Sequence, residues 1–212
     1  MKKGFFITFE GGEGTGKSTQ IERVRSGLVG RGIEVVVTRE PGGTEIAEHI
    51  RQLLLTPNKE ELTMTTELLL MFAARAQHLE HVIRPALRAG KWVLCDRFTD
   101  ATYAYQHGGR NADLVWIQTL EQMVQDGLKP DLTLLFDAPV SVTMERAIKR
   151  GKLDRFEQEG IDFMERVRET YLALAKQGQG RFRIIDASAT VDQVTIAVMD
   201  ALAPLLGTGD PL

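Results

Sequence analysis

Residues 9–19 read FEGGEGTGKST, and this stretch decides the fold. It fits the pattern G-x-x-x-x-G-K-[ST], whose fixed positions are Gly11, Gly16, Lys17 and Ser18. Glycines let backbone N–H groups close around phosphate oxygens at the N-terminus of the following helix. The pattern therefore predicts a loop that binds a nucleoside triphosphate, with the Lys17 ammonium on the β- and γ-phosphates and the Ser18 hydroxyl on Mg²⁺.

Short apolar runs alternate with helical patterns along the chain. The expected strands are the near-continuously apolar runs 5–10, 34–38, 92–96, 132–137 and 182–186. The expected helices are 17–31, 44–55, 66–89, 112–126, 140–149, 161–177 and 191–206. Pro85 should kink or split the third of them. Strands buried on both faces and joined by helices predict a three-layer α/β fold around a five-stranded parallel sheet.

Composition excludes several classes of protein. The chain has 26 Lys and Arg against 29 Asp and Glu, and this net charge of −3 argues against a coat for nucleic acid or for an anionic membrane. The single cysteine, Cys95, excludes an intrachain disulfide framework, and we expect it to be buried in a strand. No targeting or membrane-spanning stretch is visible. We therefore expect the 212 residues to form one cytoplasmic domain with a flexible tail over 207–212.

Polar residues follow the expected strands at one rim of the sheet, where ligands of parallel α/β folds bind. Asp96 ends a strand and is expected to anchor Mg²⁺ beside the phosphate loop, although Asp137 competes for this role. Arg97 would face a phosphate on the same rim. Residues 38–44 read TREPGGT, so Arg39 and the two glycines either clamp an anion or form an ordinary turn.

A charged stretch, KRGKLDRFEQEG at 149–160, separates two expected helices. Its side chains are too polar to bury one another. It is therefore either a solvated loop or a mobile lid over the bound phosphates. Two other features indicate no site: His78 and His81 lack the partners of a metal site, and Gly108 and Gly109 are expected in a loop.

The phosphate loop alone does not name the reaction, because kinases, GTPases and ATPases share it. A GTPase would read guanine through an N-K-x-D segment, and the only Asn-Lys pair, at 58–59, continues as Glu-Glu. The lack of this segment argues against a GTPase. The alternatives are a P-loop kinase that acts on another nucleotide or a nucleoside, and a nucleotide-dependent switch, although a switch needs neither a basic lid nor an acceptor pocket.

The chain resembles the thymidylate kinase family along nearly its whole length. The matching stretches, in order, are FEGGEGTGKST at 9–19, TREPGGT at 38–44, MFAARAQH at 71–78, CDRF at 95–98, DATYAYQ at 100–106, PDLTLLFD at 130–137 and RGKLDRFEQE at 150–159. The interior of the phosphate loop has no base, which resembles the bacterial type that carries its basic catalytic residues in the lid. The resemblance implies a P-loop NTPase fold of the nucleoside monophosphate kinase type with a short lid.

The resemblance implies transfer of the γ-phosphoryl group of ATP to the 5′-phosphate of dTMP, giving ADP and dTDP, with Mg²⁺ as the metal. The catalytic residues would be Lys17, Arg97, Arg150 and Arg155, with Arg150 reaching from the lid onto the transferring group. ATP would be held by the whole loop, Gly11, Gly12, Glu13, Gly14, Thr15, Gly16, Lys17, Ser18 and Thr19. Mg²⁺ would be bound by Ser18 and by Asp96, directly or through water. Family members form homodimers, so a homodimer is implied, with ATP and dTMP as its small-molecule partners.

The residues implied around dTMP are Glu13, Arg39, Glu40, Pro41, Phe72, Arg75, Arg97, Thr102, Tyr105 and Gln106. Arg75 would donate to thymine O4, and Thr102 and Gln106 would complete recognition of the base. The stacking aromatic usually lies four residues before the arginine, where this chain has Met71. Phe72 is therefore expected to stack instead.

The remaining implied contacts surround the sugar and the phosphate of dTMP. Arg97, with help from Arg39, would hold the acceptor phosphate. Tyr105 would crowd the 2′ position of the sugar and exclude ribonucleotides, and Glu13 would accept from the 3′-hydroxyl.

Overall fold

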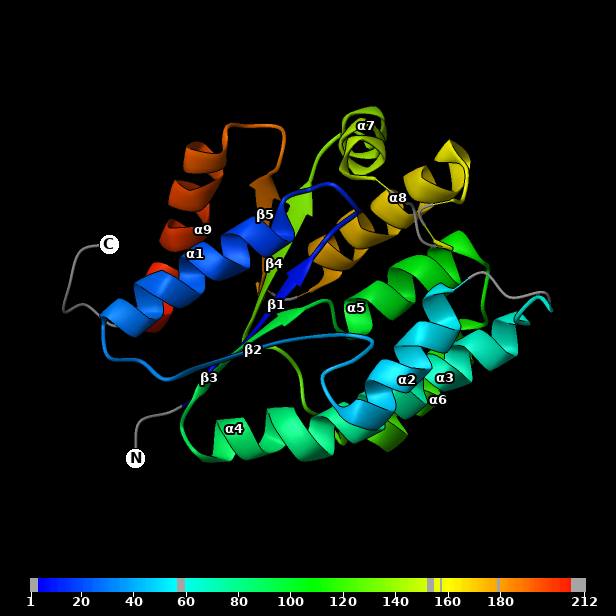
Figure 1. Cartoon of the computed structure of the whole chain (residues 1–212), viewed down its shortest axis with the longest axis horizontal. Helices are drawn as coiled ribbons and strands as arrows, with labels where there is room; N and C mark the ends of the chain where they lie inside the picture. Colours follow the sequence, from blue (N-terminus) through cyan, green and yellow to red (C-terminus); the bar gives the residue numbers. More distant parts are fainter. Residues whose placement is uncertain (1–3, 57–59, 152–154, 157, 179, 207–212) are drawn as a thin grey trace.

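A five-stranded parallel sheet forms the centre of the computed structural model, which describes residues 4–56, 60–151, 155–156, 158–178 and 180–206 (Figure 1). The strands are β1 Phe6–Glu10, β2 Val35–Arg39, β3 Trp92–Asp96, β4 Leu132–Asp137 and β5 Phe182–Asp186. They lie in the order β2-β3-β1-β4-β5, and every neighbouring pair is parallel. The predicted α/β fold and its five strands are confirmed, with boundaries that agree within one residue.

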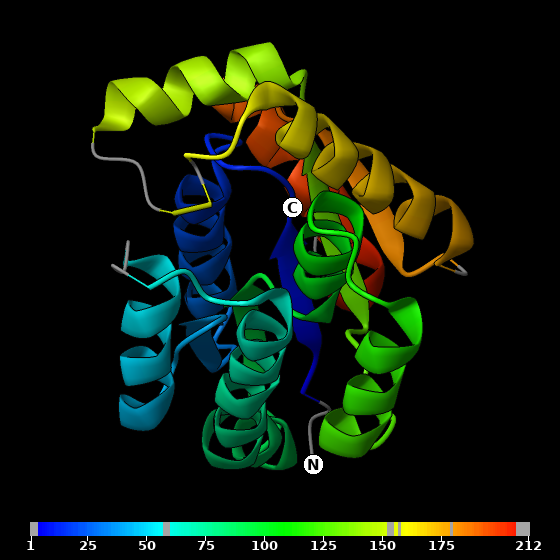
Figure 2. The same cartoon turned by 90° about the vertical axis from the view of Figure 1, so that its right-hand side faces the viewer.

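Helices cover both faces of the sheet and give three layers (Figures 1 and 2). On one face, α1 (Lys17–Gly30) and α9 (Val191–Leu206) bury Val24, Leu28, Val198 and Leu202 against the strands. On the other face, the core around Phe6 and Val93 packs against the segment that precedes α4 (Arg84–Arg88). The remaining helices of the described chain are α2 Glu45–Leu55, α3 Met64–His78, α5 Thr99–Thr102, α6 Leu114–Gln125, α7 Val140–Arg150 and α8 Ile161–Gln177.

The helix expected over 66–89 is divided into three consecutive helical segments. Helix α3 continues into the π-helix η1 (Leu79–Ile83), and α4 begins at Arg84 with Pro85 in its first turn. Proline is tolerated there because the first N–H groups of a helix have no intrahelical acceptor. The break therefore starts several residues before the proline, in the wider turn of the π-helix.

A second π-helix, η2 (Tyr103–Gly109), follows α5 and was not predicted. The expectation of a loop at Gly108 and Gly109 was wrong, because both residues lie in η2. Helix α8 passes so close to them that a Cβ on Gly109 would lie 2.4 Å from the Phe163 ring, and one on Gly108 would lie 2.1 Å from Thr170 Oγ1. These glycines serve close helix packing.

The expected lid follows α7 directly. Residues 152–154 and 157 of this segment lie outside the described residues, as does the expected flexible tail over 207–212. Arg155 and Phe156 are described, and the backbone N–H of Arg155 donates to Leu55 O at the end of α2. Across the described parts of the chain, no helix is both long and apolar enough to cross a membrane.

Candidate functional site

The phosphate loop joins β1 to α1 in a conformation that requires glycine. Gly11 has φ +127° and Gly14 has φ +71°. A Cβ on Gly11 would lie 2.2 Å from Phe136 O, and one on Gly14 would lie 2.2 Å from Thr143 O. The loop is therefore pressed against the end of β4 and against α7, which leaves its open side for a ligand.

Lys17, at the start of α1, folds back over the loop. Its Nζ donates to Gly11 O at 3.1 Å and to Gly12 O at 2.8 Å. Burial and the nearby charge of Arg97 lower the pKa of Lys17. The side chain lines a cavity of about 490 Å³ together with Thr15, Ser18, Thr19, Arg39, Arg51, Asp96 and Arg97. A phosphate in this cavity would replace the two carbonyls as the partner of the ammonium.

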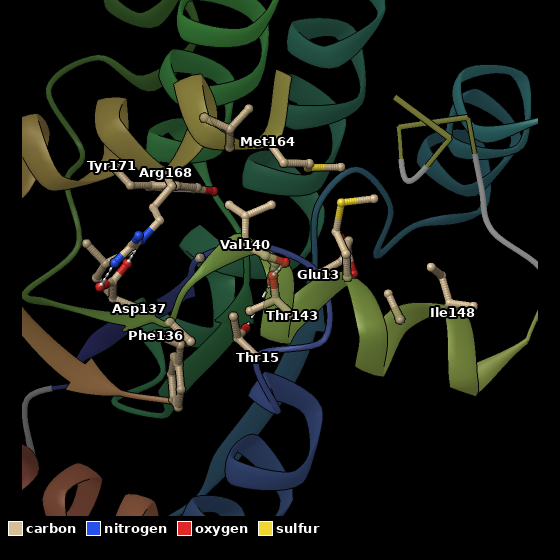
Figure 3. Close-up of a pocket in the computed structure, with 17 residues that line it drawn as sticks. Glu13, Thr15, Phe136, Asp137, Val140, Thr143, Ile148, Met164, Arg168 and Tyr171 are labelled. Atoms are coloured by element: carbon tan, nitrogen blue, oxygen red, sulfur yellow. Dashed lines mark hydrogen bonds and ion pairs between the residues drawn. The ribbon is translucent and has the colours of Figure 1, made fainter. Parts of the chain in front are cut away.

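Asp96 ends β3 and Asp137 ends β4, the strands on either side of β1, but the two carboxylates differ in their partners. Both oxygens of Asp137 accept from Arg168 of α8, at 2.7 and 2.9 Å (Figure 3). Asp96 lines the cavity that holds Ser18, and its buried Oδ1 has no hydrogen-bond partner. A buried carboxylate oxygen without a partner is unfavourable unless a cation or water completes it. The geometry therefore favours Asp96 over Asp137 as the metal-side carboxylate.

Arg97 lies between this cavity and a second one. Its φ of +67° turns the side chain back beneath the loop, where Nη1 donates to Gly11 O at 2.8 Å. Nη2 forms an ion pair with Glu13 and donates to the hydroxyl of Tyr105 at 3.1 Å. Arg97 and Glu13 line both cavities, so the two cavities meet at this ion pair.

The second cavity is lined by Glu13, Glu40, Pro41, Met71, Arg75, Arg97, Phe98, Ala101, Thr102, Tyr105, Gln106 and Phe156. Arg75 is buried within it, and its Nε donates to Glu40 Oε2 at 2.7 Å while Nη2 donates to Thr102 Oγ1 at 2.9 Å. Nη1 of Arg75 is buried and has no partner. The cavity thus presents one unused hydrogen-bond donor, which suits a carbonyl oxygen of a ligand.

Helix α3 places Met71 rather than Phe72 at this cavity. Phe72 is 2% exposed and packs in a core cluster with Leu68 and Ile117. Its ring lies 4.7 Å below the guanidinium of Arg75, which it supports by a cation–π contact. Contrary to our expectation, the residue of this pair that lines the cavity is Met71, four residues before Arg75.

Glu67 is a buried carboxylate on α3 that sequence reasoning missed. Its Oε1 accepts from Gln106 Nε2 at 2.8 Å and from Arg110 Nε at 3.0 Å. Its Oε2 accepts from Arg155 Nη2 at 2.5 Å, and Arg155 Nε donates to Leu54 O at 2.8 Å. Arg155, an expected catalytic residue, is therefore held on α2 and α3 here. The Arg150 backbone ends α7, and its side chain lies outside the described residues.

Two further buried residues, Glu10 and His78, support the site. Glu10 accepts from Phe98 N at 2.7 Å and from the Tyr171 hydroxyl at 2.8 Å. His78 lies with Nδ1 3.0 Å from Glu40 Oε1 and Nε2 2.6 Å from Thr38 Oγ1. These partners explain the histidine, and the described residues contain no group of three or more His, Cys, Asp or Glu able to hold a metal.

Two more observations concern side chains around the cavities. Arg51 of α2 lines the phosphate-loop cavity and was also missed, and burial and the neighbouring Arg39 lower its pKa. Cys95 is fully buried, as expected, and burial raises the pKa of its thiol well above the ordinary value. The cysteine is therefore held as an uncharged thiol within β3.

Comparisons with known proteins agree with one another. The family model for thymidylate kinases matches residues 9–198. A thymidylate kinase from Ectopseudomonas mendocina is 59% identical over 203 residues, which is 96% of each chain. A thymidylate kinase from Pseudomonas putida is 57% identical over 201 residues, which is 95% of each chain. The crystal structure of thymidylate kinase from Ehrlichia chaffeensis matches with a TM-score of 0.76 and 33% identity, over 94% of this chain and 99% of that one.

Proposed function

The chain belongs to the thymidylate kinase family, and we propose that its two adjoining cavities hold ATP and dTMP for transfer of the γ-phosphoryl group. Membership makes the protein a nucleoside monophosphate kinase that phosphorylates dTMP with ATP, giving dTDP and ADP. The observation that carries the proposed arrangement is that Arg97 and Glu13 line both cavities. A donor phosphate on the loop and an acceptor phosphate on Arg97 would then meet at this shared boundary.

On the donor side, the loop N–H groups and Lys17 would hold the β- and γ-phosphates of ATP. The residues present fit Mg²⁺, because Asp96 offers a buried oxygen without a partner beside Ser18 in the same cavity. Ser18 and Asp96 would hold the ion, which supplies charge neutralisation on the phosphate oxygens. The small number of protein ligands suits an ion that keeps several waters.

On the acceptor side, Arg97 would bind the phosphate of dTMP, with Arg39 as a second cation at the rim. Tyr105 and Glu13 keep Arg97 charged, since they hold its pKa above the ordinary value although burial opposes this. Arg150 would approach the transferring group from the lid, where its charge lowers the barrier. Glu13, which pairs with Arg97, would accept from the 3′-hydroxyl of the sugar.

The base of dTMP would enter the cavity around Arg75. The unpartnered Nη1 of Arg75 would donate to O4 of thymine, and Met71 would pack on the ring in place of the expected Phe72. Thr102 and Gln106, one helical turn apart on α5 and η2, would complete the base site. Tyr105 would crowd the 2′ position, while Glu40 and Pro41 close the cavity next to Arg75.

A substrate panel tests this function. Release of ADP would be measured with dTMP, dUMP, UMP, CMP, AMP and thymidine as acceptors, each with ATP and Mg²⁺. We expect dTMP to give the highest kcat/KM and thymidine to give almost no turnover, because it lacks the phosphate that Arg97 would bind. Equal activity with dTMP and AMP would overturn the proposed base site.

We also propose that two copies of the chain form a homodimer in the cytoplasm. Large apolar side chains are exposed on two adjacent helices, with Leu69 of α3 at 52%, Trp116 of α6 at 47% and Met123 of α6 at 71%. Burying such a patch against a second copy would be favourable. Light scattering on a sizing column tests this, and a monomer at micromolar concentration would contradict it.

A further inference from the structure

Behind the residues that line the acceptor cavity lies one buried carboxylate, which contacts a side chain of the lining. Glu67 is 1% exposed and lies behind Gln106, and Gln106 lines the cavity. The carboxylate accepts from Gln106, Arg110 and Arg155. Glu67 itself is not among the residues proposed to contact the substrate.

The hydrogen-bonding role of Glu67 is set by its partners. Two guanidinium groups, of Arg110 and Arg155, lie 3.0 and 2.5 Å from its two oxygens. A guanidinium can only donate hydrogen bonds, so both oxygens of Glu67 act as acceptors. Gln106 must therefore turn its NH₂ group, Nε2, toward Glu67, as the 2.8 Å contact has it.

This orientation decides what Gln106 offers to a ligand. One N–H of Nε2 is engaged by Glu67, and the carbonyl oxygen Oε1 of the same amide can accept a hydrogen bond from a ligand in the cavity. The neighbouring Arg75 offers a donor through its unpartnered Nη1. The cavity thus has a donor from Arg75 and an acceptor from Gln106, two side chains that both line it.

The donor of Arg75 and the acceptor of Gln106 match the hydrogen-bonding edge of thymine and do not match that of cytosine. Thymine has an acceptor at O4 next to a donor at N3–H. Cytosine has a donor at its 4-amino group next to an acceptor at N3. Turning the Gln106 amide over would exchange its acceptor for a donor, so thymine would lose a hydrogen bond and cytosine would gain one.

We propose that Glu67 is a positioning residue for base specificity: it holds the Gln106 amide so that the cavity accepts the N3–H of thymine and rejects cytosine. The inference rests on the proposed base site. A site built to hydrogen-bond one edge rejects a ligand that leaves its polar groups unpaired. Glu67 acts through Gln106 and has no contact with the base.

The test compares kcat/KM for dTMP with kcat/KM for dCMP in matched variants. Glu67→Gln keeps the shape of the side chain but can also donate, so the Gln106 amide is free to turn over. We expect the ratio of dTMP to dCMP to fall at least about tenfold, mainly through KM, because thymine would lose a hydrogen bond and cytosine would gain one. An unchanged ratio would overturn the inference.

A swap variant provides rescue and covers a failure of Glu67→Gln to fold. Glu67→Gln/Gln106→Glu keeps the charge within the cluster of Arg110 and Arg155, and position 106 then offers only acceptor oxygens. We expect this protein to recover a ratio within about threefold of the wild type. A folded swap variant with a collapsed ratio would overturn the inference.

Two controls separate this role from others. Arg110→Met removes one ion pair but leaves the Gln106 contact, so the ratio should hold; a collapse would overturn the inference, because Glu67 would then act through its ion pairs. Gln106→Leu removes the acceptor and should collapse the ratio whatever Glu67 does. If Gln106→Leu leaves the ratio unchanged, Gln106 does not read the base. That result would overturn the proposed base site as well as the role of Glu67.

Discussion

Nε of Arg75 lies 2.7 Å from Oε2 of Glu40, and both side chains are almost fully buried. The second oxygen of Glu40 lies 3.0 Å from His78 Nδ1. The arginine and the carboxylate come from different elements, α3 and the turn after β2, so the pair ties the TREPGGT segment to the base site. This contact explains why Arg75 can be held with one donor unused.

Loss of one member of this pair should be more costly than loss of both. Glu40→Leu leaves the Arg75 charge buried and unpaired, and should lower the free energy of unfolding by about 3–5 kcal/mol. Glu40→Leu/Arg75→Met removes both charges and should be less destabilised than the single variant. Urea unfolding of the wild type, Glu40→Leu and the double variant measures this. A double variant that is less stable than Glu40→Leu would contradict it.

The different partners of Asp96 and Asp137 give a second prediction. Asp96→Asn should lower activity at limiting Mg²⁺ by about 10–100-fold, because a group that orders the metal site is weakened. Asp137→Asn breaks an ion pair with Arg168 that is partly exposed, so it should cost under about 1 kcal/mol of stability and leave the Mg²⁺ requirement unchanged. Titration of ADP release with Mg²⁺ checks both. A larger shift for Asp137→Asn would contradict the assignment.

The sequence predicted the inner strands because they are buried on both faces and therefore form unbroken apolar runs, while the edge strands β2 and β5 are apolar but partly exposed. β1 and β4, for example, have their apolar residues fully or almost fully buried. The phosphate loop could also be predicted, because only glycine tolerates its close contacts with Phe136 and Thr143. The π-helices could not, because a single turn of wider helix leaves no period in the hydrophobic pattern.

Within the site, the sequence indicated which residue types are present but not where each side chain points or which partner it contacts. Met71 and Phe72 both lie near the Arg75 face of a helix, and only the core cluster around Ile117 decides which one is buried. Asp96 and Asp137 each end a strand, and the partner Arg168 comes from a helix far along the chain. Glu67 was missed for the same reason, since its partners Gln106, Arg110 and Arg155 meet only in three dimensions.

The two lid arginines should differ in their effects. Arg150→Ala should lower kcat by about 10³-fold or more with little change in dTMP binding, if Arg150 meets the transferring phosphoryl group. Arg155→Ala should lower kcat far less, because Arg155 is bound to Glu67 and to Leu54 O on α3 and α2. Steady-state kinetics and dTMP binding by calorimetry separate the cases. A loss confined to dTMP affinity in Arg150→Ala would remove that arginine from the catalytic role.

Glu10 gives a prediction for pH. It is fully buried, and burial together with the charge of Asp100 raises the pKa of Glu10 from 4.5 to about 8, against the opposing effects of Arg97, Tyr171 and Phe98 N–H. At pH values between about 4.5 and about 8, Glu10 keeps its proton in the folded protein but has lost it in the unfolded chain. The free energy of unfolding should therefore fall as pH rises from about 4.5 to about 8, by at most about 1.4 kcal/mol per pH unit, and level off above.

Glu10→Gln isolates this contribution, because glutamine carries no titrating proton while keeping similar shape. The difference in unfolding free energy, wild type minus Glu10→Gln, should decrease across the same pH window in urea titrations. Asp100→Asn removes a negative charge that disfavours ionised Glu10, so in that background the fall should end at a lower pH. A difference that grows with pH would mean that Glu10 is ionised in the folded protein and that Arg97 outweighs burial.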